Sequence, residues 1–151
     1  MKRLWPLTLL GAATLAQADL APTPVLPAYR AECSACHLAY PAALLPAASW
    51  QRLMAGLDRH FGSDASLDPA TTANIAAWLA ANAGTYKKVQ REAAAPPQDR
   101  ITRAPWFVRE HDEVPAATWR RADVKSAANC AACHTRADEG DFSERHIRVP
   151  R

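Results

Sequence analysis

Cys33-Ser34-Ala35-Cys36-His37 is repeated near the other end of the chain as Cys130-Ala131-Ala132-Cys133-His134. Each copy has the pattern C-x-x-C-H, the attachment signature of c-type haem. Two thiols at this spacing can form thioethers with the two vinyl groups of one porphyrin, and the adjacent His then supplies an axial nitrogen to the iron. The two copies use all four cysteines of the 151-residue chain. The sequence therefore predicts two covalently attached haem c groups, each with its iron.

The motifs assign the attachment residues and the proximal ligands directly. These are Cys33, Cys36 and His37 for haem 1, and Cys130, Cys133 and His134 for haem 2. Four cysteines could instead form two disulfides, and zinc also binds C-x-x-C together with His. Neither alternative requires a His directly after the second Cys, and a thioredoxin-like site would need a βαβ pattern that surrounds neither motif.

The N-terminus has the pattern of a secretory signal peptide. A basic start, Met1-Lys2-Arg3, precedes an apolar stretch over residues 4–15, and Ala16-Gln17-Ala18 forms an A-x-A cleavage site. Cleavage after Ala18 would leave 133 residues beginning at Asp19. No second stretch approaches the roughly 20 apolar residues that cross a bilayer. We therefore expect a soluble protein in the periplasm, without a transmembrane span in the mature chain.

The charge of the chain argues against nucleic acid as a partner. There are 18 Lys and Arg against 15 Asp and Glu, a net charge of +3, and removal of Lys2 and Arg3 leaves 16 against 15. No basic stripe persists along the chain, and haem propionates would add negative charge. Nothing in the sequence indicates an obligate oligomer, so we expect a monomer.

The composition predicts a mainly α-helical protein, because helical periodicity occurs in several segments and the period-two alternation of strands does not. A short helix is expected over residues 29–37. Ser49 is expected to cap the next helix, and Gly62 to end it. The apolar face of this helix would consist of Trp50, Leu53, Met54 and Leu57.

Two further helices are predicted from their N-caps. Asp68-Pro69 has the pattern of an N-cap followed by the first helical residue, and Gly84 would end that helix. Its buried face would consist of Ile75, Trp78 and Leu79. Ser126 is expected to cap a helix over residues 127–134 that carries the second motif.

The Pro-rich segment 93–98 is expected to link two haem modules. The predicted modules are a domain at 19–92 with haem 1 and a smaller module at 99–151 with haem 2. The second is too small for a large core of its own, so haem 2 would have to serve as its core. Four aromatic side chains are available to pack on it: Trp106, Phe107, Trp119 and Phe142.

The sixth iron ligand of haem 1 could be His60 or Met54. Met54 lies on the apolar face of the predicted helix, where core packing explains it. His60 lies two residues before Gly62, where a side chain can turn from a helix end toward an iron. We favour His60, with Met54 as the alternative.

The sixth ligand of haem 2 could be His111 or His146. His146 lies only 12 residues after His134, so a short loop would have to pass around the porphyrin edge. His111 follows Trp106 and Phe107 closely, and these aromatic rings could flank the haem. We favour His111, with His146 as the alternative.

These residues resemble those of the small dihaem cytochromes c of the periplasm, over nearly the whole mature chain. The stretches that carry the resemblance are Glu32–His37, Ala39-Tyr40-Pro41, Leu44-Leu45-Pro46, Trp50, Met54–Leu57, His60-Phe61-Gly62, Pro105-Trp106, Glu110-His111, Ala128–His134, Gly140-Asp141-Phe142 and Ile147–Pro150. The resemblance implies a class I cytochrome c-like module followed by an irregular one. It also implies low-spin haems with two His ligands each, the distal ones at His60 and His111. It further implies electron transfer to an oxygen-binding monohaem cytochrome, with a membrane b-type cytochrome as a possible source of electrons.

Electron transfer through two low-potential haems is the function that these observations predict. Two imidazoles favour a lower potential than His/Met ligation, and an iron with both axial positions filled cannot bind substrate. The alternatives are a small haem enzyme, such as a peroxidase or reductase, and a gas or redox sensor, each of which needs an open iron. Because 133 residues around two haems leave little protein for a substrate pocket, we expect no enzyme.

Overall fold

Six short α-helices joined by 3-10 turns form the regular structure of the described residues, which are 20, 23–92 and 94–150 of this computed structural model. The predicted signal peptide and Asp19 lie outside them. The helices are α1 (Pro27–Cys33), α2 (Ala47–Ala55), α3 (Pro69–Asn82), α4 (Lys87–Gln90), α5 (Pro105–Glu110) and α6 (Ala116–Trp119). Within this part of the chain, β-pairing is limited to isolated bridges, so the prediction of a mainly α protein is confirmed.

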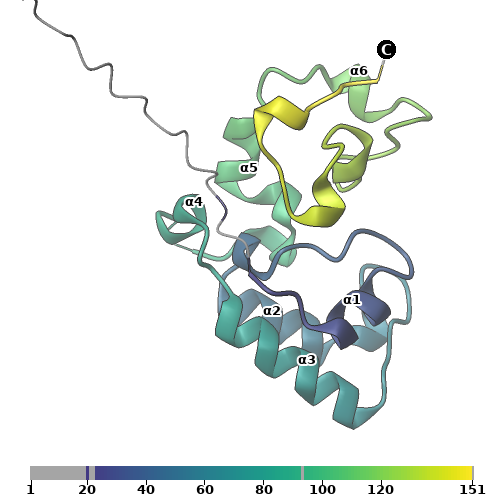
Figure 1. The fold of residues 1–151 in the computed structure, drawn as a ribbon, viewed down its shortest axis with the longest axis vertical. Coiled ribbons are helices and arrows are strands. Elements are labelled where there is room, and N and C mark those ends of the chain that lie inside the picture. Colours follow the sequence, from purple (N-terminus) through teal and green to yellow (C-terminus); the bar gives the residue numbers. More distant parts are fainter. Residues whose placement is uncertain (1–19, 21–22, 93, 151) are drawn as a thin grey trace, which may run out of the picture.

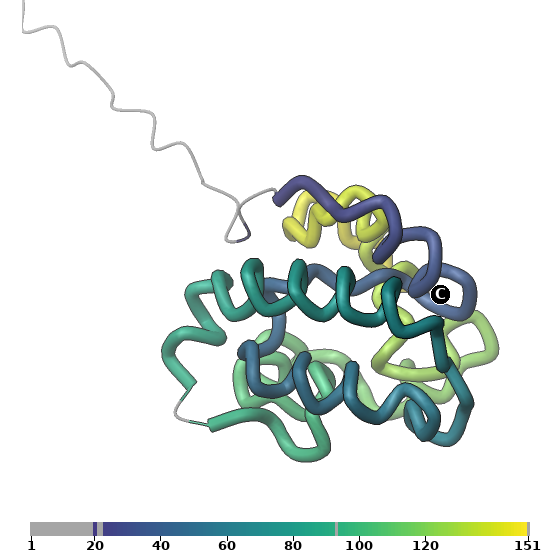
Figure 2. The backbone as a smooth tube through the Cα atoms, turned by 90° about the horizontal axis from the view of Figure 1, so that it is seen from below, coloured from purple at the N-terminus to yellow at the C-terminus, as the bar shows by residue number. Residues whose placement is uncertain are grey.

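The longest helices, α2 and α3, pack side by side in the first half of the chain (Figures 1 and 2). Ile75 and Leu79 of α3 are almost fully buried in the core that they share with Trp50 of α2. The indole of Trp50 donates a hydrogen bond to the Ala42 carbonyl oxygen at 2.8 Å. Tyr29 of α1 packs on Trp50 and Trp78, which places α1 on this pair of helices.

The start of α3 agrees with the prediction. Asp68 is the N-cap, and its Oδ1 accepts hydrogen bonds from the backbone N–H groups of Ala70 and Thr71, each at 3.0 Å. Pro69 follows as the first helical residue, where its missing N–H costs no intrahelical bond. Gly84 lies just beyond the helix with φ +64°, a conformation that favours glycine.

The predicted boundaries of α2 are wrong. The helix begins at Ala47, because the backbone N–H groups of Ser49 and Trp50 already donate to the carbonyl oxygen of Pro46. Ser49 therefore lies inside the helix and is buried. The helix ends at Ala55, and a 3-10 turn over Leu57–Arg59 then leads to His60.

The predicted helix over residues 127–134 is also absent. Cys130–Ala132 form a 3-10 turn, and Ser126 Oγ accepts a single 3.3 Å hydrogen bond from the Ala128 N–H. The carbonyl oxygen of Cys133 accepts from the backbone N–H of Arg148 at 2.8 Å. This hydrogen bond joins the C-terminal segment to the second motif.

The buried core continues from the first half into the second. Ile101, Ala104, Trp106 and Phe107 belong to the same buried cluster as the α2 and α3 residues. Trp106 also packs edge-on against Tyr86. Beyond α5 the described structure consists of the single turn of α6 and short 3-10 turns, and the C-terminal segment folds back over the second motif (Figure 1). No helix in the described ranges is long and apolar enough to cross a bilayer.

Candidate haem sites

The structure brings His60 opposite His37. His37 lies just after α1, and His60 follows the 3-10 turn Leu57–Arg59. Their ring centroids are 6.1 Å apart and their planes are inclined by 21°. Two imidazoles that bind one metal ion from opposite sides, each at about 2 Å, have centroids about 6 Å apart. The pair therefore has the separation that a single iron between the rings requires.

A second pair of histidines has the same separation. His111 lies at the C-terminal end of α5, and His134 follows the turn Cys130–Ala132. Their ring centroids are also 6.1 Å apart, but their planes are inclined by 71°. Each C-x-x-C-H motif thus has a histidine from a distant part of the chain facing its own.

One imidazole of each pair is oriented by a backbone hydrogen bond. His37 Nδ1–H donates to the Leu38 carbonyl oxygen at 2.8 Å, and His111 Nδ1–H donates to that of Phe107 at 2.9 Å. Such a bond fixes the tautomer in which Nε2 carries the lone pair that binds a metal. The Nδ1 atoms of His60 and His134 are buried and have no partner among the described residues.

The surroundings keep the unpartnered imidazoles neutral. Burial, followed by the proximity of His37 and Arg100, lowers the pKa of His60. Burial and the nearby His111 lower the pKa of His134. Neutral imidazole is the form that binds a metal ion, so these shifts favour ligation.

None of the four motif cysteines pairs with another in a disulfide, so all four are available for haem attachment. Burial raises the pKa of Cys33 and of Cys130 to about 11. Among the described residues no group of three or more His, Cys, Asp or Glu side chains converges as zinc would require. The residues present thus fit haem c better than zinc.

Aromatic rings contact the histidines of both pairs. Phe107 stacks on His111 at 4.0 Å between centroids, and Trp119 lies 5.9 Å from the same ring. Phe142 lies 5.3 Å from His134. Trp106 is buried against Phe107 and supports it. The aromatic residues proposed from the sequence therefore gather at the second histidine pair.

The two alternative ligands have other contacts. Met54 is partly buried and packs against the hydrophobic core of α2 and α3. His146 Nδ1–H donates a 2.8 Å hydrogen bond to Asp141 Oδ2. The backbone carbonyl oxygen of His146 accepts from the N–H and the hydroxyl of Thr135. His146 thus holds the C-terminal segment against the residue that follows the second motif.

Sequence reasoning missed two residues at the first site. Tyr40 stacks on His37 with centroids 5.0 Å apart. The guanidinium of Arg100 lies 4.0 Å from the ring centroid of Phe61, which itself contacts His60. Arg100 comes from the second half of the chain, so its approach to His60 depends on the tertiary fold. No local sequence signal distinguishes either residue.

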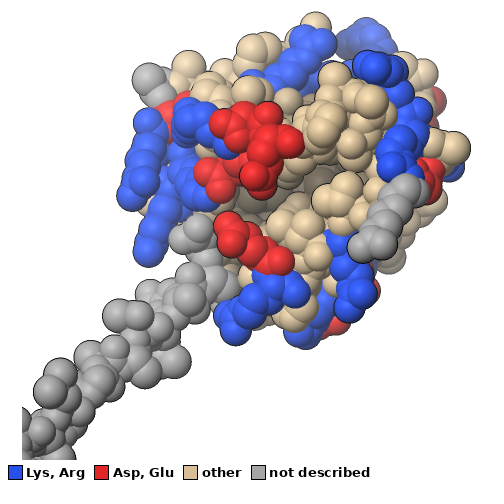
Figure 3. Space-filling model, turned by 90° about the horizontal axis from the view of Figure 1, so that it is seen from above, with Lys and Arg blue, Asp and Glu red and all other residues tan. Residues whose placement is uncertain are grey.

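A cleft of about 920 Å³ lies between residues 38–43 on one side and residues 137–145 on the other, with Tyr29, Trp78 and Phe142 among its aromatic lining. Figure 3 shows a hollowed upper face with acidic and basic side chains at the rim. No histidine or cysteine of the two sites is among the described residues that line the cleft, so it lies outside the two histidine pairs.

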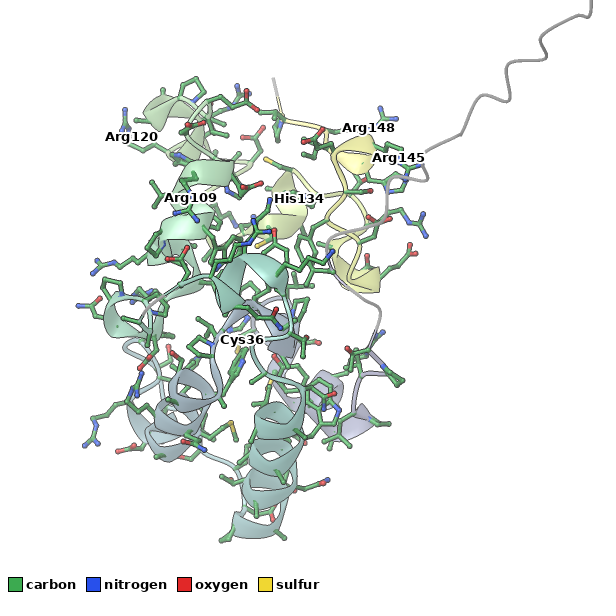
Figure 4. All side chains as sticks on the ribbon, turned by 90° about the vertical axis from the view of Figure 1, so that its left-hand side faces the viewer. Cys36, Arg109, Arg120, His134, Arg145 and Arg148 are labelled. Carbon is green, nitrogen blue, oxygen red and sulfur yellow. The ribbon has the colours of Figure 1, made fainter. Side chains whose placement is uncertain are left out.

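Basic side chains flank the second motif on two sides. Figure 4 shows His134 between Arg109 and Arg120 on one side and Arg145 and Arg148 on the other. Arg109 pairs with Glu92 at 2.8 Å.

Comparison with known proteins identifies the family. The family profile described as dihaem cytochrome c matches residues 29–142. A structure of the dihaem cytochrome c from Rhodobacter sphaeroides is 48% identical, with a TM-score of 0.72, and covers 81% of this chain and 100% of its own. A dihaem cytochrome c structure from Shewanella baltica OS155 is 39% identical, with a TM-score of 0.70 over 82% of this chain and 92% of its own. Comparison with curated proteins gives no match.

These similarities agree with the fold predicted from the sequence, a class I cytochrome c-like module followed by a smaller irregular module. They also agree with the two C-x-x-C-H motifs and the two facing histidine pairs. The chain therefore belongs to the dihaem cytochrome c family and carries two covalently bound haem c groups.

Proposed function

We propose that this protein is a periplasmic electron carrier with two low-potential, low-spin haems, each ligated by two histidines. His37 and His60 would bind the iron of haem 1, and His134 and His111 that of haem 2. The observation that carries the proposal is the 6.1 Å separation of the facing imidazoles in both pairs. Membership in the dihaem cytochrome c family supports electron transfer as the general role of this protein.

The bound haems supply the redox chemistry, because their iron can change between the ferrous and ferric states. The residues around each haem determine whether its iron can also bind a substrate and how easily it is reduced. His37 with His60, and His134 with His111, would hold the two irons, and two imidazole ligands on each iron would leave no place for a substrate and would favour a low potential. The hydrogen bonds from His37 to Leu38 and from His111 to Phe107 restrain one ligand of each pair, so the ligand geometry should change little during electron transfer.

The proposal extends to the organisation of the chain and to its partners. We infer that residues 1–18 are removed on export, and that segment 93–98 joins a module at 19–92 to one at 99–151. The proposed partners are an oxygen-binding monohaem cytochrome and a membrane b-type cytochrome. This part rests on the family resemblance of the sequence.

Absorption spectra of the mature protein in the oxidised state, in the reduced state and in the reduced state with carbon monoxide test the ligation. We expect low-spin spectra for two haems, no methionine–iron band and no response to carbon monoxide. A high-spin fraction that binds carbon monoxide would show an open iron and would favour the enzyme or sensor alternatives. A redox titration should place both haems below the range of Met/His cytochromes.

A further inference from the structure

Tyr40 contacts the first haem-attachment motif and the segment just before the second. Its ring stacks on His37, with centroids 5.0 Å apart and planes inclined by 26°. Its hydroxyl donates a 2.6 Å hydrogen bond to the carbonyl oxygen of Ala128, which lies 88 residues away in the sequence. Ala128 is two residues before Cys130, so one side chain joins the proximal histidine of haem 1 to the segment that attaches haem 2.

The backbone of Tyr40 is held by the core of the first half. The hydroxyl of Tyr29 donates a 2.7 Å hydrogen bond to the Tyr40 carbonyl oxygen. Tyr29 itself is 3% exposed and packs on Trp50 and Trp78. The backbone of Tyr40 is therefore fixed by the core of the first half. Its hydrogen bond to Ala128 can in turn restrain the segment that precedes the second motif.

Three ion pairs among the described residues also join the two halves of the chain. Arg52 of α2 pairs with Asp99 through two hydrogen bonds, Arg109 of α5 pairs with Glu92, and Lys88 of α4 pairs with Glu110, the residue before His111. At least one side chain of each pair is exposed, and exposed ion pairs hold segments together only weakly. None of the three contacts a C-x-x-C-H residue, so none restrains the two motifs relative to one another as Tyr40 can.

We propose that Tyr40 is a positioning residue for electron exchange between the two haems. Its ring sets the orientation of the His37 imidazole, and its hydroxyl sets the distance between the two attachment motifs. The inference rests on the proposed function, in that it requires two closed haems that exchange electrons. Because electronic coupling falls steeply with distance, a small separation of the motifs should slow the exchange strongly.

The exchange that Tyr40 would assist moves one electron and no proton. The electron leaves the ferrous iron of one haem and reduces the ferric iron of the other, so no outside oxidant or reductant is consumed. Tyr40 keeps its hydroxyl proton throughout, because that proton forms the hydrogen bond to the Ala128 carbonyl oxygen. The tyrosine is neither oxidised nor deprotonated in this role, and acts only through its position.

Two variants of the holoprotein separate the contributions of ring and hydroxyl. Tyr40→Phe keeps the ring on His37 and removes the hydrogen bond to Ala128. Tyr40→Leu removes both contacts. Arg52→Gln is the matched control, because it breaks a contact between the two halves that touches neither motif.

Flash reduction with less than one electron per protein measures the exchange. Because the exchange takes place within one molecule, it is the kinetic phase whose rate does not depend on protein concentration. We expect Tyr40→Phe to slow this phase severalfold, Tyr40→Leu to slow it further, and Arg52→Gln to leave it unchanged. In the electron paramagnetic resonance spectrum of the oxidised protein, Tyr40→Leu should shift the signal of haem 1, whereas Tyr40→Phe should not.

The outcomes distinguish this proposal from the function on which it rests. A Tyr40→Phe exchange rate equal to that of the wild type, with both irons closed to carbon monoxide, would refute the role of Tyr40 alone. Equal slowing in Tyr40→Phe and Arg52→Gln would also refute it, because contact between the halves in general would then be responsible. Carbon monoxide binding by the wild-type protein would refute the ligation scheme, and the Tyr40 proposal with it.

Discussion

The imidazole planes of His111 and His134 are inclined by 71°, although their centroids are 6.1 Å apart, the same distance as in the His37–His60 pair. The planes of that other pair are inclined by only 21°. In each pair one ring is stacked on an aromatic side chain, His111 on Phe107 and His37 on Tyr40. The two facing histidine pairs thus have the same spacing and different relative orientations.

This difference predicts two distinct low-spin signals in the electron paramagnetic resonance spectrum of the oxidised protein. Nearly parallel imidazole planes separate the energies of two iron d orbitals more than strongly inclined planes do. Haem 1 should therefore give the ordinary rhombic signal, and haem 2 a signal with a larger maximal g value. Two superimposable signals would contradict the difference in ring orientation.

Substitution of the distal histidines should open one iron at a time. His60→Ala should give a high-spin component and carbon monoxide binding for one of the two haems, and His111→Ala should do the same for the other. Absorption spectra of the reduced variants with carbon monoxide provide the measurement.

His146→Ala and Met54→Leu are the matched controls for these substitutions. The imidazole of His146 bonds to Asp141, and Met54 packs on the core, so neither change should open an iron. An unchanged spectrum in His111→Ala together with an open iron in His146→Ala would transfer the ligand role to His146.

Removal of the charge on Arg100 should lower the potential of haem 1. The guanidinium lies against Phe61 beside His60, and a positive charge at this position disfavours the ferric state. We expect Arg100→Gln to shift the potential of one haem downward by on the order of tens of millivolts. Voltammetry of the two haems measures this shift. Arg100→Lys retains the charge, so the potential of haem 1 should shift much less in this variant than in Arg100→Gln. Equal shifts in both variants would rule out an effect of charge.

The Asp141–His146 contact predicts a loss of stability in acid. Hydrogen bonds from Ser143, and then from His146, lower the pKa of Asp141 to about 2, from an ordinary value of 3.8. A carboxylate with a lowered pKa stabilises the folded state above its unfolded pKa, and this contribution is lost as the pH falls through the folded value. We therefore expect Asp141 to contribute above about pH 4 and to lose its contribution between about pH 4 and pH 2.

Thermal melting of the holoprotein across this pH range tests the assignment. Asp141→Asn should be less stable than the wild type at neutral pH, and the difference should shrink as the pH approaches 2. Asp138→Asn changes a nearby exposed carboxylate and should leave the melting curves unaltered. A stability difference that persists at the lowest pH would assign the loss to packing rather than to the charge of Asp141.

Truncation of a core residue should destabilise the first half strongly. Ile75 is 0% exposed on α3, and Ile75→Ala should cost about 2–5 kcal/mol through lost burial and the cavity left behind. Asn74→Ala, on the exposed side of the same helix, is the control. Chemical denaturation measures both, and a similar small effect in the two variants would contradict the assignment of Ile75 to the core.

Features that depend only on residues close together in the chain were predictable from the sequence. The two C-x-x-C-H motifs predict haem c because the attachment chemistry needs only five consecutive residues. The start of α3 was predictable because the side chain of Asp68 reaches the N–H groups of the next turn. The mainly α class followed from periodicity in the same way.

Local patterns failed where a different neighbouring group took the backbone partner. Ser49 has the chemistry of a cap, but the Pro46 carbonyl oxygen accepts from the Ser49 and Trp50 N–H groups, so α2 begins at Ala47 and Ser49 becomes buried. Ser126 could cap a helix, yet its own N–H donates to the Val124 carbonyl oxygen and Cys130–Ala132 form only a 3-10 turn. The propensity of a single residue does not show which of several neighbouring groups will bind a given backbone atom.

Which side chains face one another depends on how remote segments pack. His60 and His111 were candidates on chemical grounds, but their placement 6.1 Å from His37 and His134 depends on how α2 and α5 pack. The hydrogen bond from Tyr40 to Ala128 depends on the fold to a still greater degree, because it spans 88 residues. Covalent chemistry is encoded in short motifs, whereas distances between remote residues are set by burial of the shared core, and these distances determine the proposed ligation and electron exchange.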